Sequence, residues 1–282
     1  MTISCKFCGS IAIMKDGVRG GVQYYLCKAC HRKFAGNNAL PGMRFPPDQI
    51  ATAVSLFYEG LSLEAIRRQM NEIYSVMPSD STIYEWIVRF SKLAVERAGK
   101  YRVRTGDIWG ADETVLDVAG GRTKSNSDNT IWFWDVIDDS TRFLLGSHLS
   151  WMRTTRDAEA LFMQAMKHAS RPPKFIITDK LNAYISGIEN VFGANAKHIQ
   201  SQGFTTETHN NTIERLHGTI KQRTKVMRGM KSRATAKVVM DGWLIHYNFF
   251  RPHESLHGKT PAEVAGIHLP FDSWKTLIAT QV

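Results

Sequence analysis

Cysteine is scarce in this sequence, and segments that would carry the chain into or across a membrane are missing. The 282 residues include four cysteines, all within the first thirty positions. In a reducing compartment such a cluster favours metal ligation over disulfides. The N-terminus has no basic stretch followed by an apolar run, and no later apolar stretch reaches the roughly 18 residues of a membrane span. We therefore expect a cytoplasmic protein without membrane partners.

Acidic residues are outnumbered by basic ones. The chain has 36 lysines and arginines against 26 aspartates and glutamates, which gives a formal net charge of +10 and a pI near 9.5. This excess favours a polyanionic partner, and nucleic acid is the leading candidate. A hydrophobic content of 43% and a charged content of 22% argue against disordered and fibrous architectures. The length allows one mid-sized domain with one or two small appendages.

Residues 1–36 carry two close pairs of cysteines: Cys5, Cys8, Cys27 and Cys30. Two such pairs, with 18 residues between them, suit tetrahedral coordination of one structural Zn²⁺. Strand-like runs at 11–14 and 22–26 complete the pattern of a zinc ribbon. The segment is too short to fold on apolar burial alone, so the metal would supply stability; unliganded thiols would need a core that it lacks. His31 is expected at the surface, because four sulfurs complete the metal's shell.

Residues 44–98 follow a linker rich in glycine, asparagine and proline, and they predict three helices. Apolar residues recur at helical spacing over 48–58, 61–70 and 81–98. Polar residues at 79–81 can cap the third helix. The pattern is typical of a helix-turn-helix module whose third helix enters the major groove. The residues near its tip are Ser81, Thr82, Tyr84 and Glu85. A helical bundle that serves as a spacer or dimer contact is the alternative.

The third part of the chain, from about residue 101, combines strands with helices. A strand-like run at 107–116 has Asp112 in its middle, where a carboxylate is costly unless a cation faces it. Two more strand-like runs and an amphipathic helix follow, and a fourth run at 174–179 ends on Asp179. This order indicates an α/β domain with a mixed sheet. The two acids alone are weak evidence of a site, because aspartates at strand ends are common turn and cap residues.

A third acid, Glu214, stands at the opening of a predicted helix. One face of this helix is apolar, and the adjacent stripe carries the acid followed by positive charge. From residue 211 to 233, Glu214 is the one acid among seven basic residues: Arg215, Lys221, Arg223, Lys225, Arg228, Lys231 and Arg233. A solvated basic helix is the plain explanation. The lone acid at the head of the stripe favours a groove that follows the DNA backbone into a metal site.

Four motifs in a fixed order make the sequence similar to a known family. They are Trp-x-x-Asp-Glu-Thr at 109–114, Thr-Asp-Lys at 178–180, Asn-Asn-x-x-Glu-Arg at 210–215 and Tyr-Asn-x-x-Arg-Pro-His at 247–253. With the ending Gly-Lys-Thr-Pro-Ala-Glu at 258–263, they resemble the integrase-core transposases of prokaryotic insertion sequences over roughly residues 105–268. The 34 residues between Asp179 and Glu214 fit this branch better than the retroviral integrases.

The resemblance implies a ribonuclease-H-like α/β fold over residues 101–268: a mixed five-stranded sheet with flanking helices, preceded by the zinc ribbon and the helix-turn-helix module. It also implies an Asp-Asp-Glu triad at Asp112, Asp179 and Glu214. Two Mg²⁺ or Mn²⁺ ions, about 3.5 to 4 Å apart, would activate an attacking oxygen and stabilise a leaving one. Carboxylates suit such ions and thiolates do not. We expect Asp112 to bridge both ions.

The expected activity is that of a DNA transposase. Water would free a 3′-hydroxyl at the element end, and that hydroxyl would then attack target DNA. No nucleophile constellation occurs in the sequence, which accords with a reaction without a covalent protein intermediate. The expected partners are double-stranded DNA, as terminal inverted repeats and as target, and further copies of the chain in a dimer or larger assembly. Bound to DNA, the protein would be associated with the prokaryotic nucleoid.

Several side chains are predicted to contact this DNA: Ser81, Thr82, Tyr84, Lys221, Arg223, Lys225, Arg228, Arg251 and His253. For Arg251 and His253, an interhelical brace is an equal alternative. Asn210 and Asn211 are expected to cap the helix of Glu214 rather than to touch DNA.

The remaining acids are set aside as ligands. Alternation along the strand should turn Glu113 to the sheet face opposite that of Asp112, and Asp138 and Asp139 have the setting of turn formers. Three further acids are kept as candidate indirect partners of the ligands: Asp107, Asp117 and Asp135.

Two other functions stay open. A sequence-specific DNA-binding regulator with a relic catalytic domain would be marked by the loss of a triad residue, and none is lost. A ribonuclease-H-like nuclease that cuts without joining shares the triad, so only an assay for strand joining separates it.

Overall fold

The computed structural model describes residues 3–37, 39–99, 101–122, 128–201, 211–227 and 229–280. The chain divides into two compact units. The first comprises Met1–Phe57, Leu63–Trp86 and Phe271–Val282, and the second comprises Tyr58–Ser62 and Ile87–Pro270. Among the helices within the described ranges, none is both long and apolar enough to cross a bilayer.

The first unit begins with a small antiparallel sheet of order β1-β2-β3. Its strands are β1 (Ile13–Arg19), β2 (Val22–Cys27) and β3 (Lys33–Ala35). The turn between β1 and β2 falls on Gly20 and Gly21, whose φ angles of 54° and 77° suit glycine. Cys5, Cys27 and Phe34 form its small buried cluster. As the sequence predicts, this sheet has little apolar core of its own, and it contains one strand, β3, that the sequence analysis did not expect.

Helices make up the rest of the first unit. They are α1 (Pro47–Tyr58), α2 (Leu63–Tyr74), the first turns of α3 (Asp80–Ala98), and α9 (Trp274–Ala279). The three expected helices are present, although α2 begins and ends later than predicted. Ser79 caps α3 as predicted, because its Oγ accepts a hydrogen bond from the Thr82 backbone N–H at 3.2 Å. The sequence analysis did not anticipate α9, which buries Trp274, Leu277 and Ile278.

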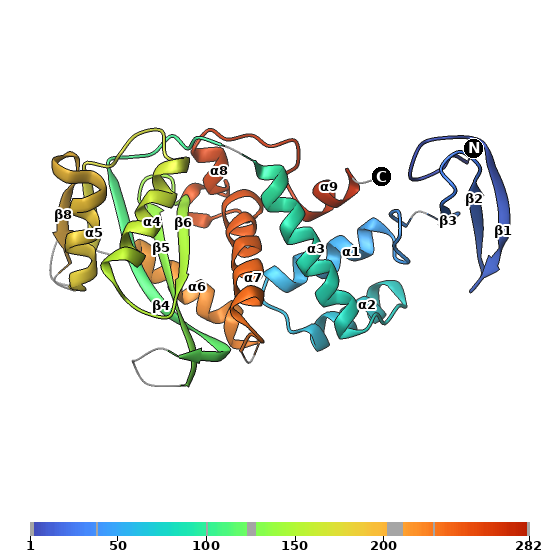
Figure 1. Cartoon of the computed structure of the whole chain (residues 1–282), viewed down its shortest axis with the longest axis horizontal. Helices are drawn as coiled ribbons and strands as arrows, with labels where there is room; N and C mark the ends of the chain where they lie inside the picture. Colours follow the sequence, from blue (N-terminus) through green and yellow to red (C-terminus); the bar gives the residue numbers. More distant parts are fainter. Residues whose placement is uncertain are drawn as a thin grey trace. The chain divides into compact units, whose positions relative to one another are not determined.

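The second unit is built on a five-stranded sheet of order β6-β5-β4-β7-β8 (Figure 1). Its strands are β4 (Ile108–Arg122), β5 (Asp128–Asp138), β6 (Leu144–Ser150), β7 (Phe175–Thr178) and β8 (Lys197–Gln200). β4, β5 and β6 pair antiparallel, whereas β7 is parallel to β4 and β8 is parallel to β7. The expected mixed five-stranded sheet with flanking helices is confirmed.

Helices cover both faces of this sheet. They are α4 (Thr155–His168), α5 (Asn182–Phe192), α6 (Asn211–Lys225), α7 (Arg233–Ile245) and α8 (Pro261–Val264), with the short turns η1 (Gly193–Asn195), η2 (His246–Phe250) and η3 (Glu254–Leu256). Successive side chains of β4 point to opposite faces. Glu113 accepts a hydrogen bond from Tyr184 of α5, whereas its neighbour Asp112 contacts His217 of α6. The helices α5 and α6 therefore lie on opposite faces.

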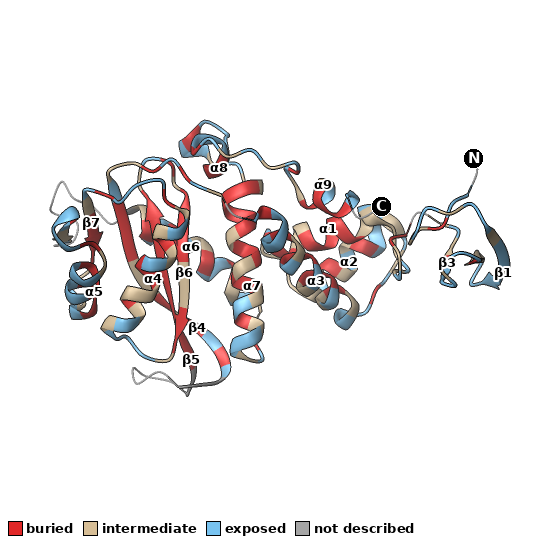
Figure 2. Ribbon diagram, turned by 45° about the horizontal axis from the view of Figure 1, so that its top comes forward, coloured by how far each residue is buried: buried red, intermediate tan, exposed pale blue. Residues whose placement is uncertain are grey.

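The core of the second unit lies along the central strands. Figure 2 shows these strands in the colour of buried residues, while exposed residues gather on the outer sides of the helices. Trp109 and Trp134 are fully buried on β4 and β5, and Trp134 meets Tyr184 edge to face with ring centroids 5.4 Å apart. Such close aromatic packing makes the central strands a rigid support for the side chains that they carry.

Candidate active site and cysteine cluster

Two of the predicted triad residues come together where β4 and β7 run side by side. The parallel register pairs Gly110 of β4 with Ile177 of β7, so Asp112 and Asp179 lie two residues further along the same direction. One carboxylate oxygen from each of Asp112, Glu113 and Asp179 lies within 4.8 Å of the others. The sheet thus gathers three acids, the carboxylate cluster, at the carboxyl end of β7.

Burial and mutual repulsion act against ionisation of the carboxylates in this cluster. Burial raises the pKa of Asp112 to about 6, and the negative charges of Glu113 and Asp179 push in the same direction against His217. Burial also raises the pKa of Glu113, again with a contribution from Asp179. Like charges held this close resist ionisation unless a cation joins them. Three hard oxygen donors in one place therefore fit a divalent ion such as Mg²⁺.

Glu113 is the member of the cluster that the sequence analysis excluded. Its side chain is 3% exposed and accepts hydrogen bonds from Arg153 Nη1 at 3.0 Å and from the Tyr184 hydroxyl at 2.9 Å. Alternation does turn it towards α5, as expected. Its exclusion as a ligand stays a prediction, although its carboxylate lies within 4.8 Å of those of Asp112 and Asp179.

His217 joins the cluster from α6, one helical turn after Glu214. Its Nδ1 lies 3.4 Å from Asp112 Oδ2, and its Nε2 lies 3.2 Å from Asp135 Oδ2. Burial alone would lower the pKa of His217, but Asp135 and Asp112 together raise it. Asp135 was predicted as an indirect partner of the ligands, whereas no role was predicted for His217. Its position three residues after Glu214, on the adjacent turn, was the signal that could have found it.

Glu214 lies in the first turn of α6 with an exposed side chain. The cluster of acids found among the described residues does not include it. Asn210, which was expected to cap this helix, falls outside the described residues. The structure therefore places Glu214 on the helix that reaches the cluster through His217, without bringing its carboxylate into the cluster itself.

The predicted DNA contacts have varied settings. Ser81 is exposed and Thr82 and Tyr84 are half-buried at the start of α3, while Lys221 and Lys225 are exposed on α6. Arg223 is only 4% exposed, and burial lowers the pKa of its guanidinium to about 10. A buried side chain cannot follow a DNA backbone, so we remove Arg223 from the predicted contacts. Arg228 lies outside the described residues.

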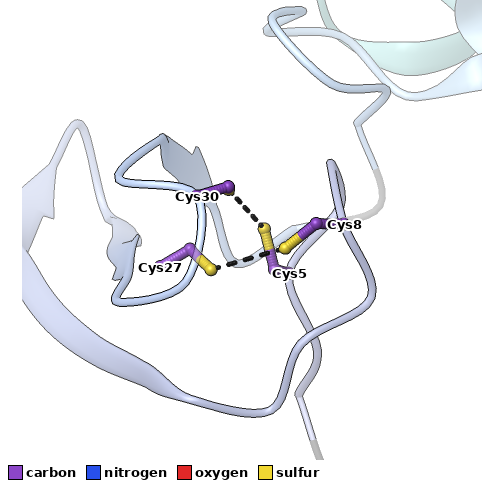
Figure 3. A group of neighbouring side chains, drawn as sticks. All are labelled: Cys5, Cys8, Cys27 and Cys30. Carbon is purple, nitrogen blue, oxygen red and sulfur yellow. Dashed lines mark hydrogen bonds between the residues drawn. The ribbon is translucent and has the colours of Figure 1, made fainter.

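The four cysteines converge at the base of the small sheet (Figure 3). Cys5 Sγ lies 3.6 Å from Cys30 Sγ, and Cys8 Sγ lies 3.6 Å from Cys27 Sγ. A tetrahedron with zinc–sulfur bonds of about 2.3 Å has edges of about 3.8 Å, so these separations fit one zinc ion. Without a metal these sulfurs compete: the backbone N–H groups of Cys30 and Ala29 help to lower the pKa of Cys27 to about 6, whereas burial and the adjacent sulfurs raise the pKa of Cys8. His31 is exposed, as expected.

Comparisons with known proteins concern mainly the second unit. The sequence model of a family described as a DDE domain matches residues 106–253, just over half of the chain. No curated protein matches the sequence.

Several solved integrase structures are among those that are similar to this chain. The HTLV-2 integrase catalytic core domain in complex with magnesium (trimeric form) is 16% identical, with 58% of this chain and 99% of that chain covered and a TM-score of 0.41. The catalytic core domain of BIV integrase is 15% identical, with 57% and 93% covered and a TM-score of 0.41. The simian T-cell lymphotropic virus intasome in complex with PP2A regulatory subunit B56 gamma is 12% identical, with 77% and 74% covered and a TM-score of 0.43.

Proposed function

This chain belongs to the DDE domain family of transposase and integrase catalytic cores, and from that premise we propose that it is the transposase of a prokaryotic insertion sequence. The proposed reaction is cleavage at the ends of the element followed by transfer of the 3′-hydroxyl into target DNA. The observation that carries the proposal is the carboxylate cluster, in which Asp112 and Asp179 meet on neighbouring strands of the matched domain. The four motifs around these residues support it.

We propose that Asp112, Asp179 and Glu214 hold the divalent ions, two Mg²⁺ or Mn²⁺ per site. When bound, such ions stabilise the attacking and the leaving oxygen of a phosphodiester displacement. Asp112 is central, because it lies beside Asp179 and is oriented by His217. Glu214 would enter the site from the exposed first turn of α6. Glu113 is the rival third ligand, because its carboxylate already lies in the cluster.

The two steps need no covalent protein intermediate. In the first step, the oxygen of water forms a bond to phosphorus, and the bond to the 3′ oxygen of the element end breaks, which leaves a 3′-hydroxyl. In the second step, that hydroxyl forms a bond to a target phosphorus and releases a 3′-hydroxyl of the target strand. Each step exchanges one P–O bond for another, and nothing is oxidised or reduced. The chain's residues therefore need only to hold and orient the reactants.

The other parts of the chain are proposed to support this reaction. We propose a division into a zinc ribbon at 1–36, a helix-turn-helix domain at 44–98 and the catalytic domain at 101–268. One structural Zn²⁺ would be held by the four cysteines. The helical domain would bind terminal inverted repeats through Ser81, Thr82 and Tyr84, with Lys221 and Lys225 of α6 along the backbone. Pairing two DNA ends requires a dimer or larger assembly.

The test incubates the purified full-length protein with Mg²⁺ and DNA that flanks its own gene. The proposal predicts 3′-end cleavage and joined products that disappear in the Glu214→Gln variant. Cleavage without joining would favour a ribonuclease-H-like nuclease. Specific binding with neither reaction would favour a DNA-binding regulator with a relic catalytic domain.

A further inference from the structure

A pocket of about 350 Å³ lies beside α6 in the second unit. The side chains that give it its chemistry are Arg142, Thr212, Arg215, Tyr247, Arg251 and His253. Three of these are arginines, and none of the described residues that line the pocket is an acid. We call it the arginine pocket. It is distinct from the carboxylate cluster, with which it shares no residue.

Arg142 is fixed in the wall of this pocket by its neighbours. It follows the turn between β5 and β6 with a φ of 60°, a left-handed conformation that is uncommon for a residue other than glycine. Its Nη1 donates to Asp139 Oδ1 at 2.8 Å and also to Thr212 Oγ1. The Thr212 hydroxyl in turn donates to Asp139 Oδ1 at 2.6 Å. Residues held in such conformations often serve function, and here the network presents a charged group to the pocket.

The opposite wall comes from the Tyr-Asn-x-x-Arg-Pro-His motif. The π-helical turn η2 ends where the Arg251 backbone N–H donates to the His246 carbonyl at 2.9 Å. This turn brings Arg251 and His253 to the pocket, and His253 packs edge to face on Tyr247 with ring centroids 4.6 Å apart. Burial lowers the pKa of His253, and the charges of Arg251 and Arg142 lower it further. Both arginines therefore lie near enough to the His253 ring to act on its charge.

Two of the three arginines keep their charge available. Within the described ranges, the side chains of Arg215 and Arg251 form no hydrogen bond and no ion pair with a carboxylate. Glu59 is near enough for Arg251 to lower its pKa, but it pairs with His246 at 3.3 Å. An interhelical brace at Arg251 would need side-chain partners of this kind. Their absence favours a ligand.

We propose that the arginine pocket binds a phosphate group, namely a phosphodiester of the DNA strand that enters the active site. Guanidinium groups match phosphate oxygens in geometry as well as charge. The volume is at the lower end of the range for small-ligand sites, so it suits one backbone phosphate with its sugar rather than the full width of a duplex. Thr212, Arg215 and Thr219 form one stripe of α6 in the pocket wall, while His217 of the same helix contacts Asp112. The pocket would therefore hold a phosphate near the one that reacts.

This inference rests on the proposed function, and its test is a binding measurement without added divalent ions. Fluorescence anisotropy of the full-length protein with a short DNA duplex would be measured over a series of salt concentrations. Arg215→Gln and Arg251→Gln should each weaken binding and reduce the slope of log K against log salt by about 1. Arg156→Gln, which removes an exposed charge on α4, is the control and should leave the slope unchanged.

A second measurement separates DNA from free phosphate. Inorganic phosphate should raise the melting temperature of the wild-type protein above its value in chloride of equal ionic strength, and Arg251→Gln should remove this shift. If Arg251→Gln removes the melting-temperature shift but leaves the salt slope of DNA binding unchanged, the pocket would be a site for free phosphate. Arg251→Lys keeps the charge but not the planar guanidinium, so it should recover only part of the DNA slope and of the melting-temperature shift. This partial recovery would show that the glutamine variant does not act through misfolding.

Wild-type behaviour of both glutamine variants in both measurements would overturn the proposal. The outcome is independent of the proposed reaction. If the protein neither cleaves nor joins DNA, but these variants still reduce the slope of log K against log salt, the phosphate pocket would be supported and the transposase function would be rejected.

Discussion

The imidazole of His217 lies between two carboxylates, 3.2 Å from Asp135 through Nε2 and 3.4 Å from Asp112 through Nδ1. Asp112 and Asp135 are directly opposite each other on β4 and β5, so their side chains share one face of the sheet. Asp135 is fully buried and holds the ring in place, and the ring in turn orients Asp112. Partners of this kind, which orient a metal ligand without binding metal, typically contribute 10- to 100-fold to affinity or activity, an order-of-magnitude range.

His217→Ala should therefore lower the rate of strand transfer by about 10- to 100-fold and raise the Mg²⁺ concentration for half-maximal rate. A Mg²⁺ titration of the joining reaction measures both. His148→Gln is the matched control, because His148 forms a similar pair with Asp157 at 3.1 Å outside the carboxylate cluster. An unchanged Mg²⁺ dependence in His217→Ala would show that the ring does not position Asp112.

Asp135→Asn should change how stability depends on pH. Burial raises the pKa of Asp135 from 3.8 to about 6, against the effect of His217. A carboxyl with a raised pKa binds its proton more tightly in the folded protein, so its contribution to stability is fully present below the unfolded pKa and is lost as the pH rises towards 6. Over pH 4 to 6, the urea midpoint should fall less in the variant than in the wild type. Parallel curves would contradict this titration.

Glutamine at Glu113 and at Glu214 should distinguish the two candidates for the third metal ligand. Glu214→Gln should lower cleavage by more than about 100-fold, beyond the loss expected for an indirect partner. Glu113→Gln keeps one oxygen that can accept from Arg153, and its amide N–H can donate to the Tyr184 hydroxyl, so it should retain measurable activity. Cleavage of one labelled DNA end by both variants at saturating Mg²⁺ is the measurement. The reverse order of losses would make Glu113 the ligand.

Removal of zinc should unfold the small N-terminal sheet, because its buried cluster of Cys5, Cys27 and Phe34 is too small to hold it. Atomic absorption should find one zinc per chain in the wild type and less in Cys8→Ser. His31→Asn should keep the full zinc content, because His31 is exposed and asparagine tolerates its φ of 54°. Zinc that persists after Cys8→Ser would refute four-sulfur coordination.

Alanine at two helical glycines should have opposite effects on the free energy of unfolding. A Cβ at Gly218 of α6 would meet no atom within 4 Å, so Gly218→Ala should stabilise the protein by about 0.5 to 1 kcal/mol through helix propensity. A Cβ at Gly187 of α5 would lie 2.7 Å from the Ala158 Cβ of α4, and overpacking of about 1 to 3 kcal/mol should outweigh the same gain. Urea denaturation of both variants tests the comparison.

The local features of this protein can be predicted from its sequence alone. Two close cysteine pairs indicate one tetrahedral site wherever the segment lies, and helical spacing predicts α1 to α3 because burial of one face repeats with the period of the backbone. The acids Asp112 and Asp179 could be placed in or at the end of strands because the runs of residues that carry them are strand-like. The order of strands and helices indicated a mixed sheet, and the order of four motifs then indicated the family.

Which side chains contact one another could be seen only in the folded structure. Strand alternation predicted the direction of Glu113 but not how far its carboxylate reaches, and the basic spacing of α6 did not reveal that Arg223 is buried. The contact of His217 with Asp135 and the shared lining of one pocket by Arg142 and Arg251 bring together residues that are 82 and 109 positions apart. Such contacts depend on how strands pair and helices pack across the whole domain, and no local period of the sequence encodes them.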